Sequence, residues 1–211
     1  MTTALTDLLF HLDEWLYQLT ALHPIGAYGV FFAIVFSESA FFPVAPFLPG
    51  DGLLFAVGVL ASTGAVNVWI AIIVLMVGGV LGNIVARQLG SWLGSSIFDW
   101  IRWLNRSHYQ KAHEFYQQHG NKAFFFSRFV PVVRALFPFV AGIAKMDKKQ
   151  FTKYNVLSVA AWVLLIVLVA HQLGHIPFIK NHFTWVIFGL AGLSIVSAIW
   201  LGLQKGLGRA A

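Results

Sequence analysis

The sequence has no cysteine, few charged residues, and no lysine or arginine before Arg87. Without cysteine the chain has no disulfide and no thiol chemistry, which excludes a disulfide scaffold and a thiol-based active site. Only 10% of the 211 residues are charged and 58% are hydrophobic, whereas soluble domains average about 25% charged residues. This composition, with its long apolar runs, predicts an integral membrane protein with a single domain over residues 1–211.

The basic residues are concentrated in the later part of the chain and give a formal net charge of +6. They cluster beside apolar segments rather than on a polar face, so they do not indicate nucleic-acid binding. Such clusters are typical of the cytoplasmic ends of spanning helices, where they contact anionic lipid. We therefore expect a cytoplasmic C-terminus and membrane lipids as partners.

Two continuous apolar runs, at about 66–92 and 151–173, are long enough to span a membrane as helices. A further run at about 183–203 predicts a closing transmembrane helix. Segments 5–19 and 97–120 have the spacing of amphipathic helices that lie on the membrane surface. The sequence therefore predicts an all-α integral membrane fold.

Between each amphipathic segment and its spanning helix lies an apolar run that is broken by proline. Because proline removes a helix hydrogen bond and clashes with the preceding turn, we expect each run to form two half-helices, as a re-entrant broken hairpin. Two ordinary spanning helices in place of each hairpin are the alternative. The predicted breaks are at Pro43, Pro46, Pro49 and Gly50 in the first run and at Pro131 and Pro138 in the second.

The elements follow the same order twice: amphipathic helix, broken hairpin, spanning helix. Repeat one covers about 5–92 and repeat two about 97–174. Each repeat crosses the membrane once, so the second is expected to be inverted relative to the first, an arrangement common in transporters. Irregular packing without symmetry is the alternative.

Four ionisable residues flank the two broken centres: Glu38 and Asp51 in the first, Arg128 and Arg134 in the second. Each costs about 2.5–3.5 kcal/mol on insertion scales. The arginine fork matches phosphate oxygens, so we predict that Arg128 and Arg134 bind a phosphate group. Glu38 and Asp51 would carry the proton that offsets its charge. A purely structural ion-pair network remains the alternative.

Catalytic chemistry has little support in the sequence. No nucleophile elbow or zinc motif is present. His171 and His175 have the i,i+4 spacing of a metal pair, but no Asp, Glu or Cys lies near them in the sequence. We therefore expect no enzyme activity, no cofactor and no metal.

Two motifs resemble those of the DedA family, in the VTT-domain (SNARE-associated Golgi protein) superfamily. The first is FSESAFFPVAPFLPGDG, which begins at Phe36, and the second is RFVPVVRALFPFVAG, which begins at Arg128. The resemblance implies a bacterial inner-membrane protein that transports lipid using the proton-motive force, with undecaprenyl phosphate as the implied lipid. It assigns functional roles to Glu38, Asp51, Arg128 and Arg134.

The chain departs from the family pattern in the first spanning segment. Gly79 occupies the position of a frequent acidic residue, and Asn83 stands where tyrosine is common, whereas Arg87 matches the family arginine. If that acid contributes to coupling elsewhere in the family, this chain lacks the contribution or replaces it.

The sequence hypothesis is thus a flippase for a phosphate-bearing lipid, active in envelope homeostasis. A proton-coupled antiporter for small cations is the first alternative, and it needs no phosphate clamp. A non-transporting protein that organises the membrane is the second. Glycine-rich helix faces permit a homo-oligomer but also serve packing within one chain.

Overall fold

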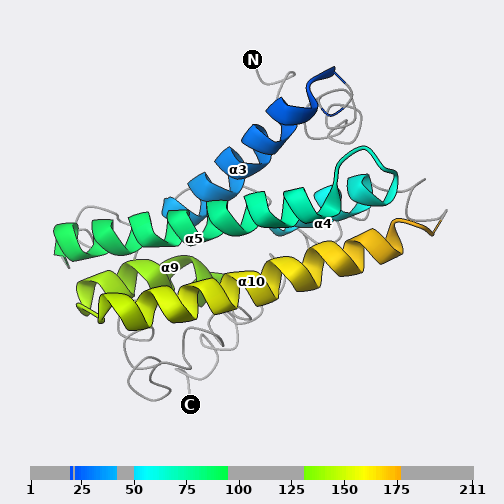
Figure 1. The fold of residues 1–211 in the computed structure, drawn as a ribbon. Coiled ribbons are helices and arrows are strands. Elements are labelled where there is room, and N and C mark those ends of the chain that lie inside the picture. The colour runs from blue at the N-terminus through cyan, green and yellow to red at the C-terminus, as the bar shows by residue number, and fades with distance from the viewer. Residues whose placement is uncertain (1–19, 21, 42–49, 95–130, 177–211) are drawn as a thin grey trace, which may run out of the picture. The chain divides into compact units, whose positions relative to one another are not determined.

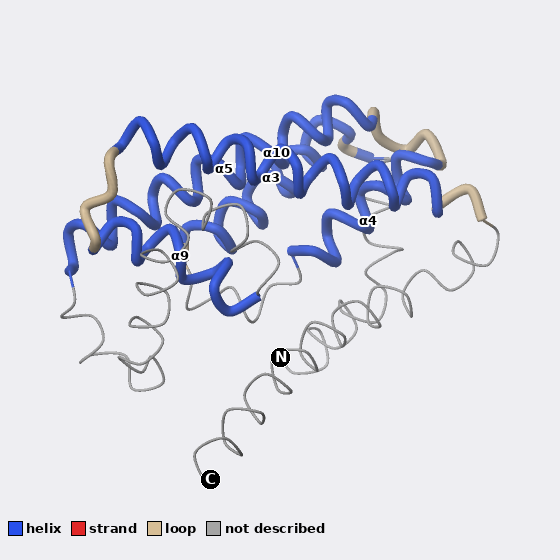
Figure 2. The backbone as a smooth tube through the Cα atoms, turned by 90° about the horizontal axis from the view of Figure 1, so that it is seen from below, coloured by secondary structure: helices blue, strands red, loops and turns tan. Residues whose placement is uncertain are grey.

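The computed structural model describes residues 20, 22–41, 50–94 and 131–176. These residues include the helices α3 (Pro24–Ala40), α4 (Gly50–Ser62), α5 (Val68–Leu93), α9 (Pro131–Ile143) and α10 (Lys148–Leu173) (Figures 1 and 2). No residue in this part of the chain forms a strand, which confirms the all-helical class there. The predicted amphipathic helices 5–19 and 97–120 and the closing helix 183–203 lie outside it.

The two predicted spanning helices are present as α5 and α10. Each has 26 residues and is long and apolar enough to cross a membrane. Asn67 begins α5, because its Oδ1 accepts the N–H of Trp69 at 3.0 Å and of Ile70 at 3.2 Å. Asp147 begins α10, since its Oδ1 accepts the N–H of Gln150 at 2.9 Å. This cap places the start of α10 three residues before the predicted start at Phe151.

The first broken run forms two separate helices, since α3 ends at Ala40 and α4 begins at Gly50. The three prolines between them, Pro43, Pro46 and Pro49, lie outside the described residues, as does the connection that would form a hairpin. The re-entrant hairpin and the inverted repeat therefore stay predictions.

The second run differs from the prediction at Pro138. Pro131 is the first residue of α9, where a missing N–H costs no helix hydrogen bond. Pro138, however, lies inside α9, so the expected helix break at this residue is wrong. The ring removes one hydrogen bond and crowds the carbonyl four residues earlier, and helices in membranes tolerate this when neighbouring groups compensate.

The chain divides into two compact units that share three of the helices. The first unit consists of Met1–Phe31, Pro49–Ile73 and Leu164–Ala211, and the second of Phe32–Leu48 and Val74–Val163.

In the first unit, α4 packs against the last part of α10. A Cβ at Gly58 would stand 2.6 Å from both the Cβ of Ala170 and the carbonyl oxygen of Val167, so only glycine permits this approach. The hydroxyl of Tyr28 accepts the backbone N–H of Asn67 at 2.8 Å, which ties α3 to the start of α5.

In the second unit, α5 and α9 touch backbone to backbone through two glycines. A Cβ at Gly90 would overlap the carbonyl of Phe139, and a Cβ at Gly142 would overlap the carbonyl of Arg87. Small residues of this kind let membrane helices approach closely. Beside this contact, a buried cluster joins α9 to the start of α10: Phe137, Ala141, Met146 and Phe151.

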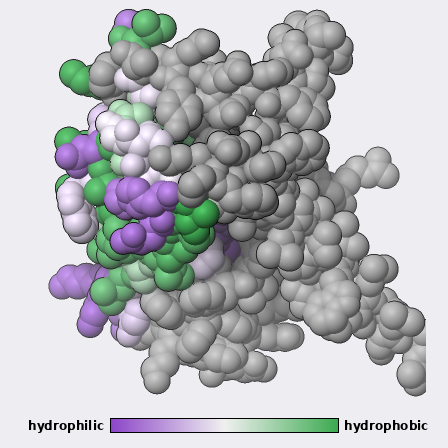
Figure 3. Space-filling view, turned by 90° about the vertical axis from the view of Figure 1, so that its right-hand side faces the viewer, coloured by the Kyte–Doolittle hydropathy of each residue, from purple (hydrophilic) through white to green (hydrophobic). Residues whose placement is uncertain are grey.

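Both spanning helices expose large apolar side chains. Figure 3 shows one face, on which hydrophobic residues lie directly beside hydrophilic ones. On α5 and α10 the exposed apolar residues include Ile70, Ile73, Val77, Leu81, Val156, Leu157, Leu165 and Val169. Apolar surface of this extent is unusual on a soluble monomer and suits contact with lipid.

Candidate functional site

The second unit brings together two of the sequence-predicted site residues, Glu38 of α3 and Arg134 of α9. Oε1 of Glu38 lies 3.5 Å from Nη2 of Arg134, and the two side chains are only 14% and 20% exposed. A tight charge-assisted hydrogen bond measures about 2.7–2.9 Å. The ion pair is therefore longer than a tight charge-assisted hydrogen bond.

Glycines of α5 place Glu38 at this position. A Cβ at Gly82 would stand 2.6 Å from the Cβ of Ser39 and 2.7 Å from the carbonyl oxygen of Phe36. One turn earlier, a Cβ at Gly78 would stand 3.1 Å from the carbonyl oxygen of Phe32. The last turns of α3 therefore lie directly on the backbone of α5.

Arg87 fastens α5 to the turn between α9 and α10. Its Nη2 donates a hydrogen bond to the carbonyl oxygen of Met146, and its guanidinium carbon lies 5.3 Å from the ring centroid of Phe151. Together with the close approach of Gly142, this contact holds the helix that carries Arg134.

Trp162 of α10 is a site residue that the sequence reasoning missed. Its ring centroid lies 5.8 Å from the guanidinium carbon of Arg134, within the range of a cation–π interaction. The available signal was its place near the middle of a spanning helix, because interfacial tryptophans lie at helix ends. Arg134 thus contacts both a carboxylate and an aromatic ring.

A buried amide pair sets the register of α10 against α5. Asn83 Nδ2 donates to Asn155 Oδ1 at 2.7 Å, and Asn155 Nδ2 donates to the carbonyl oxygen of Val80 at 3.0 Å. Trp162 follows Asn155 by seven residues, two helical turns along the same side of α10. The amide pair therefore helps fix where Trp162 stands relative to the rest of the second unit.

Both departures from the family pattern lie on this contact between α5 and α10. Asn83 supplies half of the amide pair, and a Cβ at Gly79 would stand 3.1 Å from Cγ1 of Val159. A side chain at position 79 would therefore need Val159 to shift by a few tenths of an ångström.

Of the other two predicted site residues, one is described and belongs to the first unit. Asp51 is in the first turn of α4, in the first unit, and Arg128 lies outside the described residues. The four-residue site therefore remains a prediction, of which the Glu38–Arg134 contact is the described part.

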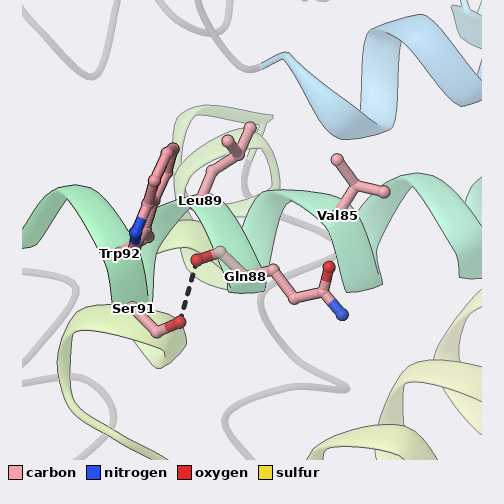
Figure 4. Close-up of a pocket in the computed structure, with 5 residues that line it drawn as sticks. All are labelled: Val85, Gln88, Leu89, Ser91 and Trp92. Atoms are coloured by element: carbon pink, nitrogen blue, oxygen red, sulfur yellow. Dashed lines mark hydrogen bonds between the residues drawn. The ribbon is translucent and has the colours of Figure 1, made fainter.

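Two other features of the described residues have the form of binding sites. A hollow of about 410 Å³ at the end of α5 is lined by Val85, Gln88, Leu89, Ser91 and Trp92 (Figure 4). No charged side chain is among these five residues, and the hydroxyl of Ser91 donates a hydrogen bond to the carbonyl oxygen of Gln88 at 2.8 Å. The rings of His171 and His175 meet edge to face at 5.3 Å, and no group of three or more metal-ligating residues occurs in the described ranges.

Comparison with known proteins assigns the family. The VTT domain model matches residues 48–172. The chain is 35% identical to protein DedA of Escherichia coli K12 over 92% of this chain and 90% of that protein. It is 35% identical to the inner membrane protein YqjA of Escherichia coli K12 over 80% of this chain and 83% of that protein. It is 34% identical to the inner membrane protein YghB of the same organism over 74% of this chain and 71% of that protein. None of the solved structures matches. The chain is therefore a membrane protein of the DedA family, with a VTT domain.

Proposed function

We propose that this protein is a transporter, dependent on the proton-motive force, that moves a phosphate-bearing lipid between the leaflets of the bacterial inner membrane. Undecaprenyl phosphate is the lipid that the family resemblance implies. The observation that carries the proposal is the pair of Glu38 and Arg134, mostly buried in a chain with two long apolar helices. A charge buried inside a membrane protein is costly, and such residues commonly mark substrate or ion pathways.

In the proposed mechanism Arg134 binds the lipid phosphate. Its guanidinium stays charged in any plausible environment and offers donors in a planar fork that matches phosphate oxygens. The phosphate would take the place that the carboxylate of Glu38 occupies in the structure, and Arg128 would supply the second arginine. The ring of Trp162 would hold the guanidinium while its anionic partner changes.

Glu38 is proposed to couple this exchange to protons. Two anions cannot share one guanidinium in a poorly hydrated site without strong repulsion. Protonation of Glu38 removes one negative charge and releases Arg134, so phosphate entry and proton uptake favour each other. Asp51 would serve as the second proton carrier. The protein would be multi-pass, with its C-terminus in the cytoplasm.

Two alternatives use the same residues differently. A proton-coupled antiporter for small cations needs the carboxylates but no arginine fork, and a membrane-organising protein needs neither to move. The cation–π contact between Arg134 and Trp162 favours the anion transporter, because it holds a cation at the site instead of leaving the carboxylate to bind one.

The experiment that tests the proposal is leaflet exchange of a labelled polyprenyl phosphate in proteoliposomes. A labelled polyprenol without phosphate is the matched control substrate. We expect exchange of the phosphate-bearing lipid well above that of the alcohol. Equal rates for the two lipids, in vesicles that contain folded protein, would contradict a phosphate site.

A further inference from the structure

A second charged feature of the second unit lies at the turn between α9 and α10, outside the contact of Glu38 with Arg134. Every lysine in the described ranges is here, and all of them are exposed. We name the group the lysine cluster, and its members are Lys145, Lys148, Lys149 and Lys153.

The turn that carries the cluster is short and hydrogen-bonded. Lys145 has a φ of 52°, its N–H donates to the carbonyl of Gly142, and the N–H of Met146 donates to the carbonyl of Ala141, each at 3.0 Å. This is the Schellman motif, in which the left-handed position usually holds glycine. A lysine is kept there at a conformational cost, and it adds positive charge just before α10.

The cluster carries an excess of positive charge. Lys148 and Lys149 occupy the first turn of α10, where the helix dipole already presents partial positive charge. Asp147 is the one acid between Lys145 and Lys153, and its carboxylate accepts the N–H of Gln150. Four cations against one acid leave an excess of positive charge that an external anion would neutralise.

Along the exposed side of α10, charged side chains are followed by apolar ones. Lys149 and Lys153 are four residues apart and therefore neighbours on one side of the helix. Val156 and Leu157, one turn further, are 40% and 52% exposed. Because α10 is long and apolar enough to span the membrane and begins at the cluster, a spanning α10 would place the lysines at headgroup level and the apolar pair at acyl-chain level.

We propose that the lysine cluster is a binding site for the headgroup of an anionic phospholipid of the surrounding bilayer. The phosphate is bound between Lys149 and Lys153, and an acyl chain lies along Val156 and Leu157. This lipid is a resident one, separate from any lipid that the protein transports, so the proposal does not depend on the proposed function. A soluble phosphate would match the lysines but not the apolar pair.

Native mass spectrometry of the full-length protein, titrated with phosphatidylglycerol or phosphatidylcholine, tests this. We expect the parent to bind phosphatidylglycerol at least tenfold more tightly than phosphatidylcholine. The double variant Lys149→Gln/Lys153→Gln should lose about thirtyfold in affinity for phosphatidylglycerol, while Lys149→Arg/Lys153→Arg should retain it. Both positions are exposed, so we expect the variants to fold. Each protein is shown to be monodisperse before the titration.

The control variant Lys205→Gln/Arg209→Gln removes the same formal charge elsewhere in the chain, and we expect it to bind phosphatidylglycerol as the parent does. An equal loss in this control, or unchanged binding by the glutamine variant, would overturn the site. Glycerol phosphate that competes with phosphatidylglycerol at equal concentration would also overturn it, in favour of a soluble anion. Failure of competition would support the lipid.

Discussion

Oε1 of Glu38 lies 3.5 Å from Nη2 of Arg134, although 96 residues separate the two in the chain. Each residue comes from a different apolar run, and each is held by contacts of glycine with a neighbouring backbone. This contact is the basis of the predictions that concern transport.

Replacement of Arg134 by lysine should weaken phosphate binding while keeping the positive charge. Lysine offers a compact ammonium instead of a planar fork, so we expect the apparent affinity for polyprenyl phosphate to fall at least tenfold. Binding titrations with the labelled lipid measure this. Affinity equal to that of the parent would favour the cation antiporter, which needs no fork.

Replacement of Glu38 by glutamine should uncouple exchange from the proton gradient. Glutamine has the shape of the protonated acid but cannot release a proton. We expect Glu38→Gln proteoliposomes to exchange lipid at one rate whether or not a pH gradient is imposed. A gradient response as large as that of the parent would remove Glu38 from the coupling mechanism.

Replacement of Trp162 should weaken anion binding through Arg134. A cation–π contact contributes about 0.5–2 kcal/mol, so Trp162→Leu should lower the apparent affinity for the lipid by roughly 2- to 30-fold. Trp162→Phe, which keeps an aromatic face, should lose less. Trp69→Leu is the control, because that side chain is 61% exposed on α5. The same loss in this control would mean that the effect is not specific to Trp162.

The contact of α5 with α9 should not tolerate a methyl group. Gly90→Ala or Gly142→Ala would place Cβ on a backbone carbonyl. We therefore expect the free energy of unfolding to fall by about 1–3 kcal/mol. Thermal unfolding in detergent detects this. Gly29→Ala, with nothing within 4 Å of the added Cβ, should be neutral or stabilising. Alanine at position 90 without loss would contradict the close approach.

The sequence predicted the continuous helices well, because hydropathy and length decide them. It placed the two spanning helices at about 66–92 and 151–173, and they are found at Val68–Leu93 and Lys148–Leu173. It was wrong at Pro138, which lies inside α9, because proline in a membrane helix does not always end the helix.

The site was only partly predictable. Because an ionisable residue in an apolar run costs free energy in a membrane, the sequence alone identifies Glu38 and Arg134 as candidates. No local pattern reveals which acid meets which arginine. The position of Trp162 in the middle of α10 was a signal in the sequence, but no local pattern shows that it meets Arg134 or that Asn83 meets Asn155, because both contacts join residues far apart in the sequence. Apolar periodicity indicates that a helix is buried and does not identify the helix against which it packs.

The most direct test of the account is leaflet exchange of labelled polyprenyl phosphate with and without an imposed pH gradient, for the parent and for Arg134→Ala. Each protein is checked for insertion and for a folded, monodisperse state before the assay. We predict exchange by the parent that responds to the gradient, and its loss in Arg134→Ala. Normal exchange by a folded Arg134→Ala protein would contradict the phosphate clamp, and no exchange by the folded parent would contradict the transporter.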